Sequence, residues 1–353
     1  MSMPLIDPQL MELGWKPFFG AQMSAEEEAK CLPVRVIAVH RGKIAVAGAG
    51  MDLLISPRIP GADAGANRPA VGDWLLLNRD SLLPVRLLRR ASLFKRVAAG
   101  GRQKVQVIAA NVDCVFIVAS CNQDFNIARL ERYLVLAQEA QVTPVVVLTK
   151  TDTADKPESF AQEVRRLRPG IVVEPVNARA AASVARLAAW CGEGQTVALV
   201  GSSGVGKSTL VNTLRSSDSI ATQAVRGEDS KGRHTTTVRE LHRLKGGGWL
   251  LDTPGMRELQ LADTSLGLAE VFDDIVAITQ QCRFSDCSHE VEPGCSVRTA
   301  LKSGQIDRER FNRWSKLAFE NVTNSEHGVR RSRIDAAPKE LRAGAGKAAK
   351  RPR

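Results

Sequence analysis

The stretch Gly201-Ser-Ser-Gly-Val-Gly-Lys207-Ser208 decides the fold class of this chain. It follows the apolar run TVALV and precedes the helix-forming run TLVNTL, which is the strand, loop and helix order of a P-loop. Such a loop turns backbone N–H groups toward the phosphates of a nucleotide, while Lys207 reaches the β- and γ-oxygens and the Ser208 hydroxyl is placed for Mg²⁺. The predicted phosphate site consists of Gly201, Ser202, Ser203, Gly204, Val205, Gly206, Lys207, Ser208 and Thr209.

Apolar runs alternate with helical stretches on the N-terminal side of this loop. The runs CVFIVAS, PVVVLTK and IVVEPV are separated by helical patterns at residues 127–141 and 158–168. Strands that alternate with helices predict a parallel sheet covered on both faces, hence an α/β domain. The sheet pattern continues in TVALVG, in VRELHRL at 238–244 and in GWLLDTPG at 248–255.

Two segments after the P-loop are typical of switches that respond to the γ-phosphate. Asp252-Thr-Pro-Gly255 ends an apolar strand, where the carboxylate meets the Mg²⁺ water shell and Gly255 offers its N–H to the γ-phosphate. The polar segment 232–237 suits a mobile loop in which a threonine, taken here as Thr236, closes on Mg²⁺.

The nucleotide base is read by Thr149, Lys150, Thr151 and Asp152, which follow the strand VVVL. A carboxylate at that position accepts hydrogen bonds from guanine N1–H and its 2-amino group, so we expect GTP rather than ATP. The usual form of the element is Asn-Lys-x-Asp. Thr149 stands in place of Asn, and we expect weaker binding rather than changed specificity. Asn177-Ala178 departs in a similar way from the Ser-Ala that often meets the guanine O6.

The order of these elements predicts a circular permutation. In ordinary GTPases the P-loop comes first and the carboxylate that recognises guanine comes late. Here Asp152 precedes Gly201, and the switches at 232–237 and 252–257 follow. The second switch is thereby tethered to the C-terminal region, so the nucleotide state is able to move that region directly.

A metal-ligand pattern follows the α/β region. Cys282, Cys287, His289 and Cys295 form C-x₄-C-x-H-x₅-C, and three thiolates with one imidazole suit tetrahedral Zn²⁺ with no open position. We therefore predict one structural zinc per chain. The other cysteines, Cys31, Cys114, Cys121 and Cys191, lie in or near apolar runs and are expected in the core.

The remaining regions are a β-rich segment and a basic tail. Short β-type runs between residues 34 and 90 predict a small all-β barrel. The net charge is +11, and residues 328–353 carry nine Lys or Arg against two acidic residues. This composition predicts a tail that is disordered when free and binds polyanions. No run approaches the ~20 apolar residues of a membrane span, and no secretory signal pattern begins the chain, so we expect a cytoplasmic protein without a membrane partner.

These motifs together closely resemble the RsgA family of bacterial GTPases that depend on the small ribosomal subunit. The resemblance covers roughly residues 30–325 and rests on the P-loop, Thr149 to Asp152, Asp252 to Gly255, the Cys/His cluster, Val71-Gly-Asp-Trp74, Ala110-Asn-Val-Asp113 and Arg233-His-Thr-Thr236. It implies an OB-fold, a permuted GTPase domain and a zinc-binding domain that bind the 30S subunit and its rRNA late in maturation, with hydrolysis stimulated by the subunit. We expect a monomer with an N-terminal extension at 1–30, the OB-fold at 31–95, the GTPase domain at 96–275, a small α-helical zinc-binding domain at 276–327 and the tail at 328–353.

Catalysis is predicted to depend on His234. Many GTPases place a Gln directly after Asp-x-x-Gly to orient the attacking water, whereas this chain has Met256, which cannot form that hydrogen bond. His234, beside the switch threonines, is the polar candidate, and the resemblance supports it. The alternative is a loop histidine that bonds phosphate or RNA.

Two other functions compete with a ribosome-dependent GTPase. A P-loop ATPase or kinase with a small-molecule substrate is disfavoured by Asp152. A nucleic-acid-binding module that uses the nucleotide only as a structural ligand would show no stimulated turnover. The basic residues of the β-rich segment are compatible with rRNA phosphates but include ordinary surface charge.

Overall fold

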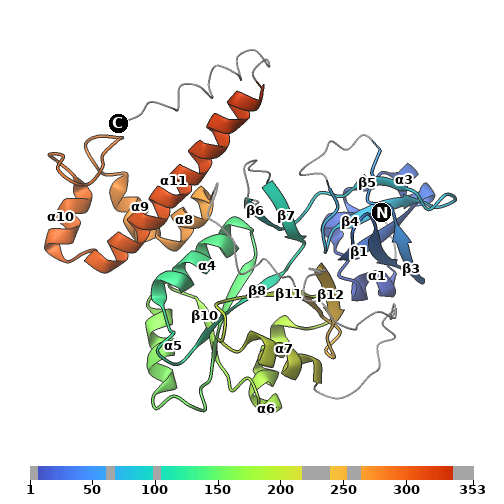
Figure 1. Cartoon of the computed structure of the whole chain (residues 1–353), viewed down its shortest axis with the longest axis horizontal. Coiled ribbons are helices and arrows are strands. Elements are labelled where there is room, and N and C mark those ends of the chain that lie inside the picture. The colour runs from blue at the N-terminus through green and yellow to red at the C-terminus, as the bar shows by residue number, and fades with distance from the viewer. Residues whose placement is uncertain (1–6, 61–67, 98–104, 217–238, 253–263, 337–353) are drawn as a thin grey trace, which may run out of the picture. The chain divides into compact units, whose positions relative to one another are not determined.

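The computed structural model describes residues 7–60, 68–97, 105–216, 239–252 and 264–336, with only the backbone at 96–97, 105, 216, 252 and 325–336. Two compact units divide the chain. Unit 1 consists of the described residues of Met1–Lys95 and Gln106–Leu259. Unit 2 consists of the described residues of Arg96–Val105 and Gln260–Arg353. Each unit is described by itself below, and Figure 1 labels their elements.

Unit 1 begins with three short helices and five antiparallel strands, which form where the β-type runs predict them. The helices are α1 (Pro8–Glu12), α2 (Pro17–Gly20) and α3 (Ala25–Lys30), and the strands are β1 (Cys31–Val39), β2 (Ile44–Gly48), β3 (Met51–Ile55), β4 (Trp74–Asn78) and β5 (Pro84–Leu87). Strand β1 pairs with both β2 and β4, and the edges continue as β2 with β3 and β4 with β5. Alternate apolar residues, Val34, Val36, Ile44, Val46, Leu75 and Leu77, form their shared core.

The second half of unit 1 is the predicted parallel sheet. Its strands are β8 (Cys114–Ser120), β9 (Thr143–Thr149), β10 (Val172–Pro175), β11 (Thr196–Val200) and β13 (Trp249–Asp252), in the spatial order β10-β9-β8-β11-β13. The adjacent β12 (Arg239–Arg243) is antiparallel to β13. The helices are α4 (Ile127–Glu139), α5 (Pro157–Arg165), α6 (Ala181–Val184) and α7 (Lys207–Ser216), with a 3₁₀ turn η1 at Ala185–Trp190.

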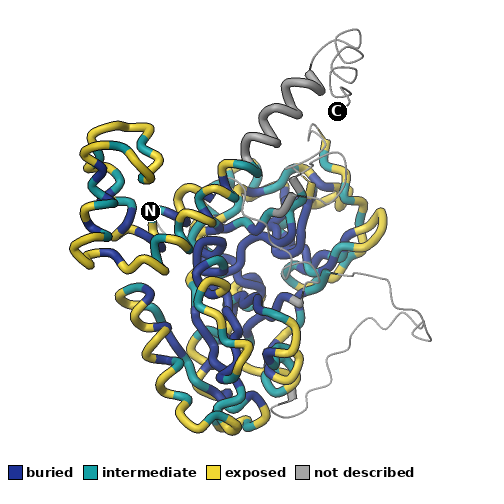
Figure 2. The backbone as a smooth tube through the Cα atoms, turned by 60° about the vertical axis from the view of Figure 1, so that its left-hand side comes forward, coloured by how far each residue is buried: buried dark blue, intermediate teal, exposed yellow. Residues whose placement is uncertain are grey.

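Both faces of this sheet are covered, which explains its continuous apolar strands. Cys114, Phe116 and Val118 of β8 join a cluster that includes residues of α6, η1 and α7. The intervening residues of β8 are buried as well, and α4 packs against β8 and β9. In Figure 2 the buried residues, drawn in dark blue, lie in the interior of the molecule and are surrounded by intermediate and exposed segments. Cys31, Cys114, Cys121 and Cys191 are all buried, as predicted.

The β-rich half and the parallel half of unit 1 share one hydrogen-bonded sheet. Strand β12 pairs with β1 through Ala38 with Glu240 and Val39 with Arg239. The segment 7–30, to which the sequence patterns assign no fold, packs into the same region. Leu10, Trp15 and Phe19 are each less than 10% exposed, and a Cβ on Gly14, at φ +88°, would lie 2.7 Å from the Gly194 carbonyl oxygen. Glycine is therefore required for this close approach.

Unit 2 contains the helices α8 (Ser265–Val271), α9 (Asp273–Thr279), α10 (Ser296–Ser303) and α11 (Arg308–Ala336). Strands β6 (Leu93–Val97) and β7 (Val105–Ala110), most of whose residues belong to unit 1, pair in a separate two-stranded sheet. The Asn321 side chain of α11 accepts hydrogen bonds from the backbone N–H of Thr264, at 2.9 Å, and from its hydroxyl, at 3.1 Å. Because both residues are more than 90% buried, this contact anchors the start of α8 to α11.

Helix α11 begins within the zinc-binding domain predicted at 276–327 and extends beyond its end. It continues to Ala336, nine residues into the stretch expected to be irregular. A helix already nucleated by packed residues adds further polar residues at little cost, which explains the extension. Leu317 of this helix is buried, whereas Val322 is 52% exposed, and the covered position beside it is Asn321. In the described part of the chain, no helix is long and apolar enough to cross a bilayer.

Candidate functional site

The predicted P-loop connects β11 to α7. Gly201 has φ +144°, and a Cβ there would lie 2.3 Å from the carbonyl oxygen of Val118 on β8. Only glycine therefore lets the loop leave the sheet so close to the neighbouring strand. Ser203, Gly204, Ser208 and Thr209 are exposed, and α7 begins at Lys207, so its N-terminal N–H groups open toward solvent. This arrangement is an anion-binding helix N-terminus.

Lys207 curls over the loop that precedes it. Its ammonium group donates hydrogen bonds to the carbonyl oxygens of Gly201, at 2.8 Å, and of Ser202. The positive charge therefore lies against the loop at the position where phosphate oxygens would approach.

Thr149 lies beneath the P-loop rather than on its open side. Its side chain is fully buried, and its hydroxyl lies 2.5 Å from the carbonyl oxygen of Val205 and 3.2 Å from that of Ala119. A Cβ on Gly206 would lie 3.3 Å from the same hydroxyl. The structure thus places the Thr149 hydroxyl where it ties the base-recognition loop to the phosphate loop.

The other residues of the base-recognition loop lie nearer the surface. Lys150 has φ +58°, which turns the chain sharply after β9, and Asp152 is exposed just beyond it. The side-chain oxygen of Asn177 accepts a hydrogen bond from the backbone N–H of Arg179 at 3.0 Å, and the Thr213 hydroxyl of α7 donates to the Ala178 carbonyl at 2.6 Å. Thr149 therefore holds the loop 149–152 against the P-loop, and Thr213 holds the loop 177–178 against α7. Both loops are predicted to contact the base.

The switch residues are only partly described. Asp252 is the last residue of β13, and β13 is the neighbour of β11, which leads into the P-loop. His234, Thr236, Gly255 and Met256 lie outside the described residues.

The Cys/His cluster forms in unit 2 as its spacing predicts. The ligand atoms of Cys282, Cys287, His289 and Cys295 all lie within 4.8 Å of one another. His289 Nδ1 is 3.6 Å from the sulfur atoms of both Cys282 and Cys295. Burial lowers the pKa of His289, which favours the neutral imidazole that a metal requires. These four groups can hold a metal ion.

Aromatic side chains of α11 cover the histidine of this cluster. The His289 ring centroid is 6.0 Å from that of Trp314 and 6.4 Å from that of Phe311. The residues that give α11 its apolar face thus also orient the cluster.

Comparisons with known proteins agree with this geometry. The family model described as RsgA GTPase matches residues 87–262. A small ribosomal subunit biogenesis GTPase RsgA of Mesorhizobium japonicum is 46% identical over 360 residues, covering 99% of this chain and 100% of the relative. The chain belongs to the RsgA GTPase family. It is accordingly an enzyme that hydrolyses GTP.

Other relatives extend the comparison. A Vibrio parahaemolyticus protein named small ribosomal subunit biogenesis GTPase RsgA 2 is 49% identical over 317 residues, covering 89% of this chain and 86% of that protein. The crystal structure of YjeQ from Thermotoga maritima matches with a TM-score of 0.60 and 25% identity, over 83% of this chain and 99% of that one. YloQ, described as a circularly permuted GTPase, matches with a TM-score of 0.57 and 24% identity, over 84% and 97%. The chain therefore has the permuted GTPase fold that its motif order predicts.

Two further side chains contact this RsgA site, and no sequence motif predicts them. Thr213 contacts the Ala178 loop, and Arg129 of α4 contacts Ser202 of the P-loop. Neither belongs to a named motif. Their partners lie 35 and 73 residues away, so no local signal identifies them.

Proposed function

We propose that this GTPase binds the small (30S) ribosomal subunit and its rRNA, assists the late maturation of that subunit and hydrolyses GTP faster when bound to it. The curated relatives are named as small ribosomal subunit biogenesis GTPases, and one of them aligns over its full length. Such a role would place the protein in the cytoplasm as a monomeric factor.

The observation that carries the proposal is the position of the second switch. Strand β13 ends at Asp252, and the helical unit with the Cys/His cluster begins with α8 at Ser265. The segment 253–263 is the covalent link between them. A γ-phosphate that reorders this link therefore acts on the helical unit. Binding of the ribosomal subunit to the helical unit would in this way be coupled to GTP hydrolysis.

For the nucleotide site, we propose that the P-loop residues Gly201 to Thr209 bind the phosphates and that Asp152 binds guanine. Thr149, Lys150 and Thr151 complete the base loop. Asp252 would contact the Mg²⁺ water shell, and Gly255 would donate its N–H to the γ-phosphate. Asp152→Asn should weaken GTP and GDP binding by about 2 kcal/mol, since a hydrogen bond to a charged group contributes roughly 1.5 to 3 kcal/mol. Equal affinity of the wild type for ATP and GTP would contradict this assignment.

For catalysis, we propose that His234 orients the attacking water and that Ser208 and Thr236 hold Mg²⁺. The metal would neutralise charge on the phosphates, and the histidine would replace the Gln that Met256 precludes. His234→Ala should lose most of the stimulated rate while GTP affinity is retained, because an interaction made only in the transition state lowers kcat alone.

The domain assignment is also a proposal. The five antiparallel strands of 31–95 would be an OB-fold that contacts rRNA, 96–275 the GTPase domain, 276–327 the zinc-binding domain and 328–353 a basic tail. Three thiolates and one imidazole that converge within 4.8 Å fit a structural Zn²⁺.

The decisive experiment measures GTP hydrolysis with purified 30S, 50S and free rRNA. We expect 30S to raise kcat severalfold or more, 50S to leave it unchanged, and high salt to abolish the effect because phosphate contacts weaken as counterions compete. Equal stimulation by both subunits would exclude a specific small-subunit partner.

A further inference from the structure

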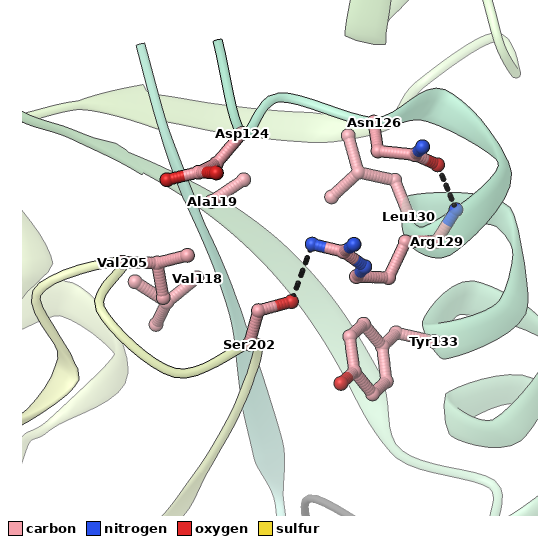
Figure 3. A pocket seen from close by; sticks show the side chains of 9 residues that line it. All are labelled: Val118, Ala119, Asp124, Asn126, Arg129, Leu130, Tyr133, Ser202 and Val205. Carbon is pink, nitrogen blue, oxygen red and sulfur yellow. Dashed lines mark hydrogen bonds between the residues drawn. The ribbon is translucent and has the colours of Figure 1, made fainter. Parts of the chain in front are cut away.

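A side chain outside every predicted motif is hydrogen-bonded to the P-loop. The Arg129 guanidinium of α4 donates a hydrogen bond to the Ser202 hydroxyl at 2.6 Å, across a small pocket also lined by Asp124, Tyr133 and Val205 (Figure 3).

The backbone of Arg129 is fixed by the start of its helix. Asn126 is the N-cap of α4, and its side-chain oxygen accepts a hydrogen bond from the Arg129 N–H at 2.9 Å. Leu130 and Tyr133 of the same helix are less than 10% exposed, so α4 is held by burial. The exposed Arg129 side chain therefore extends toward the loop from a rigid base.

Ser202 lies between two positive charges. Its hydroxyl contacts Arg129, and its carbonyl oxygen accepts a hydrogen bond from the Lys207 ammonium group. Three positions farther along, the Val205 carbonyl is held by Thr149. Side chains from α4 and from the end of β9 thus hold the phosphate loop at two points.

We propose that Arg129 is a positioning residue for GTP binding, which acts through Ser202 and not by touching the substrate. The hydrogen bond keeps the loop N–H groups in the arrangement that receives phosphates, so less ordering is required when the nucleotide binds. The guanidinium charge adds to that of Lys207 and of the N-terminus of α7. Its contribution should therefore grow with the number of phosphates on the nucleotide.

The test measures the dissociation constants of GTP, GDP and GMP by competition against a fluorescent GDP analogue, on the full-length protein. Arg129→Ala should weaken GTP and GDP binding about threefold to tenfold, as expected for one partly exposed hydrogen bond to a charged group, and GMP binding less. Arg129→Lys should recover most of the affinity because it keeps the charge. Arg186→Ala on η1 removes the same charge from an exposed position of unit 1 and is the matched control.

Three further measurements separate positioning from a general loss of structure. Ser202→Ala and Arg129→Ala together should cost less than the sum of the two, because both remove the same contact. The Arg129→Ala effect should shrink as salt rises, and KM for GTP should rise more than kcat falls. An equal loss for all three nucleotides, or a loss no larger than that of Arg186→Ala, would overturn the proposal.

Discussion

The N-terminal segment at 7–30, which forms three short helices, and the Cys/His loop at 282–295, which forms none, are fixed by different forces. Trp15 and Phe19 pack against Trp74 of β4, with ring centroids 4.8 and 5.8 Å apart, so burial holds the N-terminal segment. In the Cys/His loop, Phe284 is 41% exposed and Val291 is 80% exposed. Because these apolar side chains of the loop contribute little burial, the loop depends on its ligand set.

Polar contacts reinforce the burial of the N-terminal segment. Arg35 of β1 is 1% exposed and donates hydrogen bonds to the Leu13 carbonyl and, at 2.6 Å, to the Thr196 hydroxyl of β11. Lys16 forms an ion pair with Asp113, whose other carboxylate oxygen accepts a hydrogen bond from the Thr196 N–H at 2.8 Å. The segment is therefore fastened to both the β-rich half and the parallel sheet of unit 1.

The largest expected effect comes from removing the metal. Because a structural metal supplies folding free energy locally, Cys287→Ser or a strong chelator should unfold unit 2 while nucleotide affinity in unit 1 stays nearly intact. Metal analysis should find one zinc per chain. Hydrogen exchange should show lost protection in α8 to α10 and retained protection in β8 to β11. A zinc-free protein with a fully protected unit 2 would contradict the ligand assignment.

The next effect is expected at Arg35. Burial lowers its pKa to about 10, so the guanidinium remains charged at neutral pH. Arg35→Met should destabilise unit 1 by about 3 to 5 kcal/mol, because buried acceptors lose their donor and Asp73 and Asp113 lose a neighbouring charge. Urea unfolding followed by tryptophan fluorescence measures this. Arg41→Met, at an exposed position that follows β1, is the control and should change stability by less than about 0.5 kcal/mol.

The difference between the two regions also explains what the sequence could predict. The four ligands lie within one stretch of fourteen residues, and the P-loop is equally local, so their spacing alone carries the chemistry. Contacts of the N-terminal segment join residues far apart in the sequence, 97 positions for Lys16 with Asp113 and 237 positions for Glu12 with Trp249. Nothing in the local pattern of 7–30 distinguishes a packed segment from a loose extension.

The same reasoning applies within the nucleotide site. The P-loop, the base loop and the alternation of strands and helices follow local rules, and β8, β9, β10, β11 and β13 are parallel as predicted, whereas β12 is antiparallel. Thr149 illustrates the limit. Its departure from Asn was visible in the sequence, but its contact with the Val205 carbonyl depends on how β9 and β11 are arranged across the sheet.

A smaller effect is expected at the contact between α1 and β13. The Trp249 indole N–H donates a hydrogen bond to the Glu12 carbonyl at 2.8 Å, and Arg243 forms an ion pair with the Glu12 carboxylate. Trp249→Phe should cost about 1 to 2 kcal/mol from the lost hydrogen bond and the smaller ring. Glu12→Gln leaves the carbonyl in place and should cost well under 1 kcal/mol, because the ion pair is exposed. Similar losses for both variants would show that the ion pair, rather than the backbone acceptor, fastens α1.

The smallest effect is a pH dependence at the end of the N-terminal segment. Glu27 accepts hydrogen bonds from Arg86 of β5 and, within its capping box, from the Ser24 N–H, and these contacts lower its pKa to about 2. Since the folded pKa lies below the unfolded value of about 4.3, the contact stabilises the protein above pH 4.3, and this stabilisation disappears as the pH falls toward 2. Because the pair is partly exposed, we expect about 1 kcal/mol or less. Urea midpoints at pH 6 and pH 3 should therefore differ less in Glu27→Gln than in the wild type, whereas Glu28→Gln, at the exposed neighbour, should follow the wild type. A Glu27→Gln variant that loses as much stability as the wild type between these two pH values would show that Arg86 contributes nothing through this carboxylate.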